Sequence, residues 1–375
     1  MRKLKIVALT FLAVLVILSV FIRIRYGGGE YYPNLSTEPL FPEDSLEIVF
    51  TYDQAFGNLA VSKDNRIFFT VHPESRPEGD KLLEIVNGKA KAFPNEAFQD
   101  QFITVLGTFI DKNNVLWTID HGNHGLQTVR LLAFDLSTNE LVHDHTFSPE
   151  IAGIGSFYND LQVSKEGMVY IADLNLFGKN PAVVVYNSKT GESRRLLEND
   201  ASVYPQDWII RNNNMDVTFF WGLFALKPGI DGLVLSANEN YLFYGAMAHD
   251  GLFRIKTEYL NNTSLLPKEL SRFVEQVGPK PLNDGLSIDT LNNVYITDVE
   301  HNGIMRLSPD GKLITLIKSN KIRWADGASF GGDGYLYFTD SALPDQMLRS
   351  KSHMKSAAPY HILRFNPKVA GIPGR

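Results

Sequence analysis

Four oxygen-bearing side chains recur at one position of a repeating sequence pattern. The third to sixth copies of the pattern begin, in chain order, with Asn159, Asp231, Asp284 and Asp326. Carboxylate and amide oxygens are the ligands that hard cations such as Ca²⁺ prefer. Three carboxylates brought close together repel one another unless a proton or a counter-ion intervenes. The spacing therefore predicts a divalent-cation site, with Ca²⁺ as the expected ion, if the fold brings these copies together.

A structural interpretation of the same positions remains open. Asn or Asp before Gly often starts a strand by accepting a hydrogen bond from a nearby backbone N–H. Among the four residues, Asp326 is also a candidate catalytic group, because a carboxylate can activate water or attack a carbonyl. His121 is a second catalytic candidate, since imidazole titrates near neutrality. It shares the Gly-rich stretch 120–125 with His124, and a loop held by its own hydrogen bonds explains that stretch equally.

Three further residues are candidates for the wall of a ligand pocket. Asn283 precedes Asp284, and Trp324 lies two positions before Asp326. Trp221 belongs to an aromatic-rich stretch, 198–230, that separates two copies of the repeat. This stretch either covers the site and provides an aromatic wall or supplies one more strand and core packing.

The repeat itself predicts the elements that position these residues. Each copy reads apolar-x-apolar, a short polar turn, then an apolar or aromatic strand that often ends in Thr-Asp or Ala-Asp. The alternation is typical of a β-hairpin with one buried face, and repeats of this length are typical of four-stranded propeller blades. The copies predict an all-β, six-bladed β-propeller with the first strand of each blade along a central channel. The strand Tyr360–Phe365 is expected to close the ring by joining the first blade. The copies begin at these residues: Gly57, Leu106, Asn159, Asp231, Asp284 and Asp326.

The N-terminal segment predicts a membrane anchor. The apolar run 6–22 follows three basic residues and is followed by Arg23 and Arg25, without a small-x-small cleavage site. Basic residues before a span favour a cytoplasmic N-terminus and an exported body; a cleaved signal peptide is the alternative. The expected organisation is a signal anchor at 1–25, a flexible linker at 26–44, the propeller at 45–366 and a C-terminal tail at 367–375. The propeller is then periplasmic or extracellular.

Composition excludes several classes of function. The chain has no cysteine, which rules out disulfides, thiolate metal sites and a cysteine nucleophile. Its formal net charge of −6 disfavours a nucleic-acid partner. The expected partners are a small molecule in the channel and a membrane at the N-terminal helix, with the propeller as a monomer.

Several segments resemble the major royal jelly protein/yellow family across roughly residues 45–366. The resemblance lies in 156–163 with 170–173 and 183–195, and in 82–95, 116–122 and 231–236. It implies a secreted six-bladed propeller, whose relatives are pigment-related proteins with dopachrome isomerisation, nutritive proteins or small-amine binders. The blades are more distantly similar to gluconolactonases and paraoxonases, which implies metal ligands at Asn159, Asp231 and Asp284. Those enzymes carry a first-blade Glu where this chain has Gly57.

Three functional hypotheses follow. The first is a metal-dependent hydrolase of lactones or esters, in which Asp326 and His121 are catalytic. The second is a non-hydrolytic ligand-binding or dopachrome-isomerase-like protein. The third is a scaffold that presents the propeller rim to other envelope proteins. The loss of the first-blade Glu argues against the first, and the aromatic stretch 198–230 favours the second.

Overall fold

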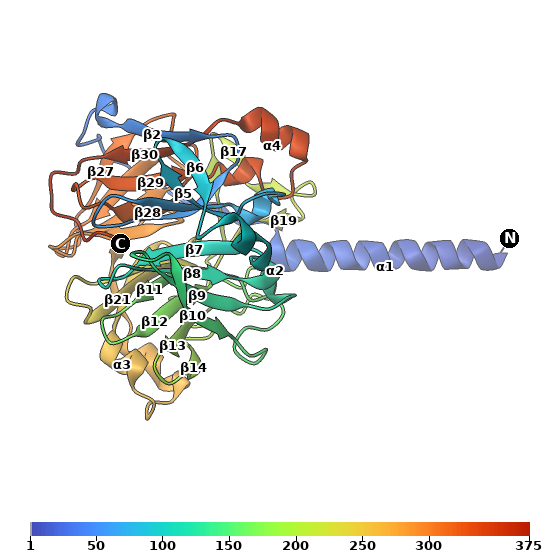
Figure 1. Cartoon of the computed structure of the whole chain (residues 1–375). Helices are drawn as coiled ribbons and strands as arrows, with labels where there is room; N and C mark the ends of the chain where they lie inside the picture. Colours follow the sequence, from blue (N-terminus) through green and yellow to red (C-terminus); the bar gives the residue numbers. More distant parts are fainter. Residues whose placement is uncertain (1) are drawn as a thin grey trace.

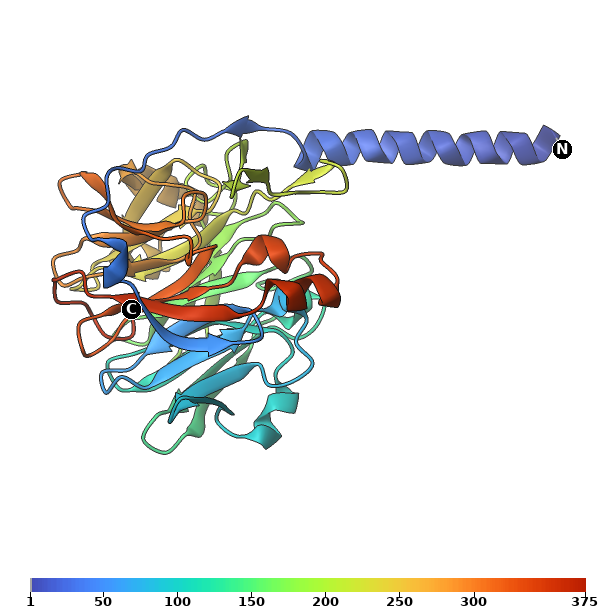
Figure 2. The ribbon, with the colours of Figure 1, turned by 90° about the horizontal axis from the view of Figure 1, so that it is seen from above.

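The computed structural model describes residues 2–375, with side chains from residue 3 onward. It is a six-bladed β-propeller from which one long helix, α1 (Arg2–Tyr26), projects (Figures 1 and 2). Six four-stranded antiparallel sheets form the blades. The first strand of each blade contacts the first strand of the next, and these six strands surround the channel.

The hairpins predicted from the repeat are the two inner strands of each blade. The first three blades are β3 (Phe56–Val61), β4 (Ile67–Val71), β5 (Leu82–Val86) and β6 (Lys89–Ala92); β7 (Val105–Ile110), β8 (Val115–Asp120), β9 (Arg130–Asp135) and β10 (Glu140–Thr146); and β11 (Tyr158–Val163), β12 (Met168–Asp173), β13 (Ala182–Asn187) and β14 (Ser193–Leu196). Their inner strands are almost entirely buried, because the faces of neighbouring blades pack together. This packing explains why they read as nearly continuous apolar runs.

The last three blades follow the same plan with one exception. Their strands are β20 (Ile230–Leu235), β21 (Tyr241–Ala246), β22 (Gly251–Lys256) and β23 (Glu275–Pro279); β24 (Leu286–Ile288), β25 (Val294–Asp298), β26 (Gly303–Leu307) and β27 (Leu313–Lys318); and β28 (Ala325–Phe330), β29 (Leu336–Asp340), β30 (Tyr360–Phe365) and β2 (Glu47–Tyr52). The expected closure was wrong in direction. Strand β30 completes the third position of its own blade, and the N-terminal strand β2 supplies the fourth.

The segment expected to be a flexible linker lies on the propeller. Strand β1 (Glu30–Tyr31) pairs in parallel with β15 (Trp208–Ile209). Further on, the backbone N–H of Leu40 donates to the carbonyl of Thr315 at 3.1 Å. The ring of Phe41 packs near Phe365. These contacts hold the segment against the propeller, because its backbone polar groups pair with propeller strands and the Phe41 ring packs on Phe365.

The C-terminal residues also pack against the propeller. The Arg375 guanidinium donates to the Ser236 carbonyl at 2.9 Å and forms a 2.7 Å ion pair with Glu239. The Arg375 backbone oxygen accepts hydrogen bonds from Phe330 N and Ser287 Oγ. The segment therefore lies over the channel end opposite α1, where the C label appears in Figure 1.

The end of the propeller nearer α1 carries most of the irregular structure. The short turns α2 (Gly122–Gly125), η2 (Pro73–Ser75), η5 (Leu343–Asp345) and helix α4 (Lys351–Ala357) connect strands there. Between blades three and four, small hairpins form from β16 (Arg211–Asn212) with β17 (Met215–Asp216) and from β18 (Thr218–Phe219) with β19 (Phe224–Ala225). The 3-10 turn η3 (Glu96–Gln101) connects β6 to β7 at this same end, whereas helix α3 (Thr257–Asn261) and the 3-10 turns η1 (Glu43–Ser45) and η4 (Pro267–Phe273) lie elsewhere.

Candidate functional site

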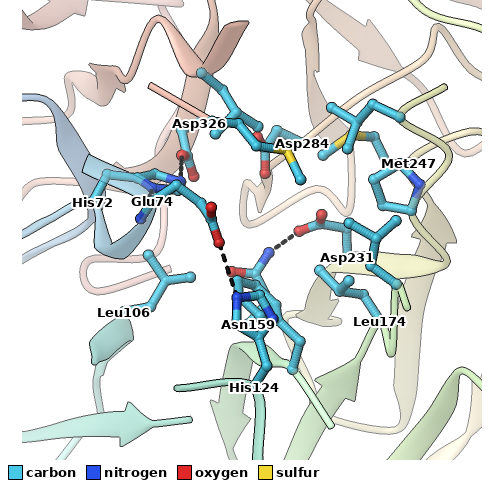
Figure 3. A pocket seen from close by; sticks show the side chains of 16 residues that line it. His72, Glu74, Leu106, His124, Asn159, Leu174, Asp231, Met247, Asp284 and Asp326 are labelled. Atoms are coloured by element: carbon cyan, nitrogen blue, oxygen red, sulfur yellow. Dashed lines mark hydrogen bonds and ion pairs between the residues drawn. The ribbon is translucent and has the colours of Figure 1, made fainter. Parts of the chain in front are cut away.

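A pocket opens at the end of the channel nearer α1, and all four predicted cation ligands line it (Figure 3). Its free volume of about 40 Å³ has room for about three water molecules. Most of the remaining wall is apolar and comes from Leu106, Phe157, Leu174, Leu176, Leu226, Pro228, Met247, Leu343 and Met347. The aromatic-rich stretch contributes Leu226, so it does cover the channel, mainly with packed apolar side chains.

β-Bulges direct the first-strand side chains into this pocket. In blade three the pairing of β11 with β12 shifts register between Tyr158 and Leu161, which leaves Asn159 outside the ladder. The same shift occurs around Asp231 in β20 and around Asp326 in β28. A bulge turns a side chain away from the ordinary alternation of a strand. Residues at the same position of the repeat therefore point in the same direction, into the pocket.

The Thr-Asp that ends the second strand of several repeats supports these bulges. The Thr297 hydroxyl accepts a hydrogen bond from Asp284 N at 3.0 Å. The Asp340 carboxylate accepts from the backbone N–H groups of Arg323 and Trp324, just before Asp326. The Thr-Asp pairs therefore position the first strands and are structural.

Close packing between blades explains the glycine in Asp-Gly. A Cβ on Gly285 would lie 2.1 Å from the Asp326 carbonyl oxygen, and one on Gly232 would lie 2.7 Å from that of Asp284. Neither distance is possible for a real side chain. The glycine is thus required by the neighbouring blade, and this requirement leaves the preceding carboxylate free for another role.

The three carboxyl groups are buried and interact with one another. Burial raises the pKa of Asp284 to about 6. Burial and then the charge of Asp284 raise the pKa values of Asp231 and Asp326 well above the usual range. Asp284 accepts a 2.7 Å hydrogen bond from the Trp324 indole, and Asp231 accepts one from the Asn159 amide. The cluster is therefore electrostatically strained in the way that a bound cation would relieve.

The donor chemistry of the cluster fits a hard divalent cation, although the side chains are not gathered around one point. Among the described side chains, no three His, Asp or Glu residues lie close enough together to hold one ion. Asn159 directs its amide nitrogen at Asp231, and Asp326 lies 3.6 Å from His72. Holding a cation would require the Asn159 amide to present its oxygen instead. Asn159, Asp231, Asp284 and Asp326 are thus suitable ligands in kind, and their role as ligands stays a prediction.

A second group of polar residues, which the sequence analysis did not identify, faces the four. His72, Glu74 and His124 also line the pocket (Figure 3). The His124 Nε2 atom lies 3.0 Å from Glu74 Oε1, and His124 Nδ1 has no hydrogen-bond partner among the described residues. Burial alone would raise the pKa of Glu74, but the hydrogen bond and charge of His124 outweigh it, so that pKa is lowered. Burial lowers the pKa of His72 to about 4.

The other predicted catalytic residue, His121, lies just behind this group. Its side chain is buried but is not part of the pocket wall. Its ring lies 4.3 Å from that of Phe157, and its Nδ1 accepts a 3.1 Å hydrogen bond from His124 N. Burial, followed by the nearby His124 and His72, lowers its pKa well below the usual range. His121 therefore positions His124, which is the imidazole that reaches the pocket.

The three residues predicted for the pocket wall lie elsewhere. Trp324 is fully buried behind Asp284 and reaches the site only through its hydrogen bond to that carboxylate. Asn283 is buried beside Asp284 and donates to its carbonyl at 2.8 Å. Trp221 was predicted wrongly: its side chain is fully exposed at the tip of the β18–β19 hairpin. Phe219 and Phe224 of that hairpin turn inward instead.

The structure also shows what surrounds Gly57, the position that corresponds to the first-blade Glu of the gluconolactonase-like enzymes. A Cβ on Gly57 would lie 2.7 Å from Leu106 Cδ1 and 2.8 Å from Thr70 Oγ1, so neighbouring side chains already fill that space. The acid that blade one brings to the pocket is Glu74, from the turn η2 after β4. A replacement of Gly57 by Glu would therefore displace Leu106 rather than simply restore a ligand.

The comparisons with known proteins agree with this architecture. The sequence profile of the family described as "Major royal jelly protein" matches residues 103–315. Major royal jelly protein 3 of Apis mellifera is 30% identical over 41% of this chain and 28% of its own length, and major royal jelly protein 1 is 27% identical over 40% and 35%. The chain thus matches about a third of the length of these curated relatives.

Solved structures show the same fold at low sequence identity. A gluconolactonase from Xanthomonas campestris superposes with a TM-score of 0.55 at 14% identity, over 91% of this chain and 98% of that chain. A calcium-binding regucalcin from Agrobacterium tumefaciens gives 0.55 at 11% identity, over 88% and 96%. The family match covers more than half of the sequence, and the propeller accounts for all its repeats. The chain belongs to the major royal jelly protein family.

Proposed function

We propose that this propeller binds a small organic ligand in the channel pocket beside a divalent cation and hydrolyses a lactone or ester bond there. The observation that carries the proposal is the composition of one pocket wall. Three buried carboxylates, an amide and the Glu74–His124 pair line the same pocket. This combination supplies both the ligands for a cation and a group that can move a proton.

Residues Asn159, Asp231, Asp284 and Asp326 would hold the cation. When bound, a divalent cation supplies a Lewis acid that polarises a carbonyl oxygen and favours an ionised water at neutral pH. The neighbouring structures named for gluconolactonase and for calcium binding support this choice of chemistry. They share only the fold with this chain, so the assignment rests on the pocket.

His124 is the best candidate for the general base. Because the pKa of Glu74 is lowered, its carboxylate is ionised and accepts the proton of His124 Nε2. That hydrogen bond places the lone pair on Nδ1, which is buried and has no partner among the described residues, so it would take a proton from a water molecule bound inside the pocket. A carboxylate that orients an imidazole in this way also stabilises the imidazolium that forms. Asp326, 3.6 Å from His72, is a second carboxylate able to assist.

The apolar wall sets the class of ligand. Leu106, Leu174 and Met247 line the pocket together with the polar groups. The free volume of about 40 Å³ is too small for a drug-sized molecule without movement of these side chains. A small lactone or ester with one apolar group fits this surface better than a sugar, which would leave its hydroxyl groups unpaired against it.

Metal content and hydrolysis can be tested separately. The purified full chain is expected to hold one divalent ion by elemental analysis and to melt at a lower temperature after chelation. Asp284→Asn should weaken metal retention, whereas His124→Gln should retain the metal and lose about 10²-fold or more of kcat on a panel of lactones and esters. Asp216→Asn, on an exposed residue, is the matched control. Absence of stoichiometric metal together with an unchanged melting temperature would refute the cation, and full activity of His124→Gln would refute the base.

A non-hydrolytic binding function is the second candidate, and one observation favours it. The described side chains include no ready cluster of three His, Asp or Glu ligands. A protein that only binds an aromatic or amine ligand needs no such cluster. It would show a ligand-dependent rise in melting temperature without turnover, and this rise would be unaffected by chelation.

We further propose that α1 anchors the propeller on the extracytoplasmic side of a membrane. The candidate span of α1, Lys3–Tyr26, has 24 residues, which at 1.5 Å per residue is about 36 Å against the roughly 30 Å hydrocarbon core of a bilayer. Its apolar run 6–22 covers about 26 Å of that core, and the basic residues at both ends reach the interface. Its apolar side chains are exposed rather than packed on the propeller. Membrane fractionation and N-terminal sequencing test this: a soluble mature protein beginning near residue 27 would refute the anchor.

A further inference from the structure

Large apolar side chains are exposed around the pocket end of the propeller. They lie on the loops that connect blades at this end, beside residues of the pocket wall: Leu348 follows Met347, and Leu126 follows the turn that contains His124. Single exposed apolar residues are ordinary, but a group around one opening marks an interaction surface. We call this surface the mouth rim, and it consists of Leu126, Ile154, Phe177, Phe220, Trp221 and Leu348.

Two loops of the mouth rim hold the C-terminal end of α1, where the helix meets the propeller. Arg23 donates to the Gly222 carbonyl at 2.6 Å, in the same turn as Trp221. On the other side, the Tyr26 hydroxyl donates to the Phe177 carbonyl at 2.7 Å, and Lys179 Nζ donates to the Arg25 carbonyl at 2.7 Å. The rim therefore lies at the level where the apolar run of α1 ends and its basic residues begin.

The turn that carries Trp221 is unfavourable for a protein surrounded only by water. Phe220 and Trp221 have φ angles of 52° and 56°, a left-handed conformation that is a genuine outlier for bulky residues. The turn nevertheless presents both rings outward, with Trp221 fully exposed. Left-handed strain costs about 1–3 kcal/mol per residue and marks functional surfaces. This turn lies beside Arg23, where the apolar run of α1 ends, and Trp side chains are enriched at that level of a membrane–water interface.

Aromatic contacts connect the helix base to the pocket. The ring of Tyr26 lies 5.9 Å from that of Phe224, which lies 6.0 Å from Phe177. Phe177 in turn lies 5.4 Å from the imidazole of His124 in the pocket wall. The rim is therefore continuous with both α1 and the pocket. In Figure 1, α2, which carries His124, and β19, which carries Phe224, both lie at the base of α1.

From this geometry we propose that the mouth rim rests in the headgroup region of the bilayer that α1 enters, so that the pocket opens toward the membrane. The inference rests on the proposed anchoring by α1 and extends it, because an anchored propeller could equally stand away from the bilayer on its linker. Contacts between residues 23–31 and the propeller leave no such free linker. Ligands that partition into the bilayer, with an apolar chain and a hydrolysable or amine head, then reach the pocket most readily.

The bilayer is a better occupant of the rim than a second copy of the chain. The cationic side chains of Arg23, Arg25 and Lys179 surround the helix base, and cations beside exposed aromatics suit anionic lipid headgroups and the interface. Other exposed apolar residues, such as Val142 on β10, lie away from this end, although Met215 on the β16–β17 hairpin is exposed near it. Self-association through the rim would also have to accommodate α1 projecting from the centre of the interface.

Tryptophan quenching in vesicles tests the proposal with the full chain. The protein is reconstituted in phosphatidylcholine and phosphatidylglycerol vesicles with and without bromine in the upper part of one acyl chain. Trp117 and Trp324 are buried and Trp208 is half-buried, so Trp221 is the indole available to lipid. Bromolipid is expected to quench part of the emission, and Trp221→Phe should abolish that part while Trp208→Phe retains it. Equal quenching in the wild type and Trp221→Phe would overturn the proposal.

Two engineered indoles extend the test across the rim. In the Trp221→Phe background, Ile154→Trp is expected to be quenched by bromolipid, and Val142→Trp is expected to be quenched by aqueous iodide instead. Iodide quenching of both would show that the rim faces water. Protection of Trp221 that rises with protein concentration but not with bromolipid would assign the rim to a second copy. Flotation of the vesicles separates the two proposals: a protein that floats but is not quenched refutes only the rim contact, and one that does not float refutes the anchor as well.

Discussion

Replacement of Lys280 should change the pH dependence of stability more than any other single lysine substitution. Lys280 is fully buried, and among the described residues its ammonium donates hydrogen bonds to the carbonyl oxygens of Met247 at 3.4 Å and Pro281 at 3.2 Å. Burial lowers its pKa from 10.5 to about 7, against the opposing charges of Asp250 and Asp231. The difference between a pKa of 10.5 and one of about 7 corresponds to roughly 5 kcal/mol between the charged and neutral forms.

The direction of the effect follows from proton binding. Between pH 7 and 10.5 the unfolded chain keeps a proton on this amine that the folded protein has lost, so stability rises with pH in that window. Below pH 7 both states are protonated, and the full cost of burying the charge is present. Lys280→Met keeps the length of the side chain and removes the charge. The variant should therefore gain up to about 5 kcal/mol relative to the wild type near pH 6, less the two lost hydrogen bonds, and less than about 1 kcal/mol near pH 10.

Urea unfolding of the detergent-solubilised protein at several pH values measures this difference. Lys89→Met, on an exposed residue of β6, is the control and should give a difference that does not depend on pH. A constant difference between Lys280→Met and the wild type from about pH 6 to pH 10 would refute the reasoning. It would show that the lysine titrates in the folded protein as it does in the unfolded chain.

Two further substitutions test the packing described above. Arg195→Met removes the 2.5 Å partner of the fully buried Asp173 and should cost about 3–5 kcal/mol of unfolding free energy by urea titration; a loss below about 1 kcal/mol would mean that solvent reaches the carboxylate. Gly285→Ala places a Cβ 2.1 Å from the Asp326 carbonyl oxygen. It should lower the free energy of unfolding by about 1–3 kcal/mol or more, which is measured as a fall in melting temperature. Gly79→Ala, with no atom within 4 Å, is its control, and equal losses in the two would contradict the close approach of the blades.

The fold could be predicted from the sequence because a propeller repeats its pattern. Each copy combines an alternating strand with a polar turn and a second strand, which in three copies ends in Thr-Asp or Ala-Asp, and every predicted copy forms the inner hairpin of a blade. Ring closure was predicted in the wrong direction. The strand β2 lies before the first copy and does not share its motif, so only tertiary pairing reveals that it belongs to the last blade.

The site was predictable to the extent that its residues follow the repeat. Asp231, Asp284 and Asp326 share one register and reach one pocket. His72 and Glu74 lie in a loop, where the alternation of a strand does not predict which way a side chain points. The sequence nevertheless contained one indication of their role. Val71 and Asp120 hold equivalent positions in their ladders, so His72 corresponds to His121 in the next blade. Aligning the residues after the second strands would have drawn attention to that loop.

The direction of aromatic side chains could not be read from composition. The stretch 198–230 contains both Phe224, buried above the pocket, and Trp221, turned to the outside. Which ring turns inward depends on the hairpin between β18 and β19 and on its left-handed turn. Gly222, with φ of 80°, marks the turn in the sequence. The two residues before it, Phe220 and Trp221, are also left-handed, and no glycine or asparagine at those positions indicates it.

The pairing of β2 with β30 also determines when the sixth blade can form and close the propeller. As a chain is synthesised, residues 47–52 appear early and residues 360–365 appear late, so the sheet that contains both must wait for more than three hundred intervening residues. Until then both edges of β2 are open and invite pairing with other chains, and the face of β3 that contacts β28 is uncovered. A nascent molecule tethered by α1 would hold those edges beside the membrane, where a pause in synthesis before Tyr360 leaves it vulnerable to aggregation and proteolysis.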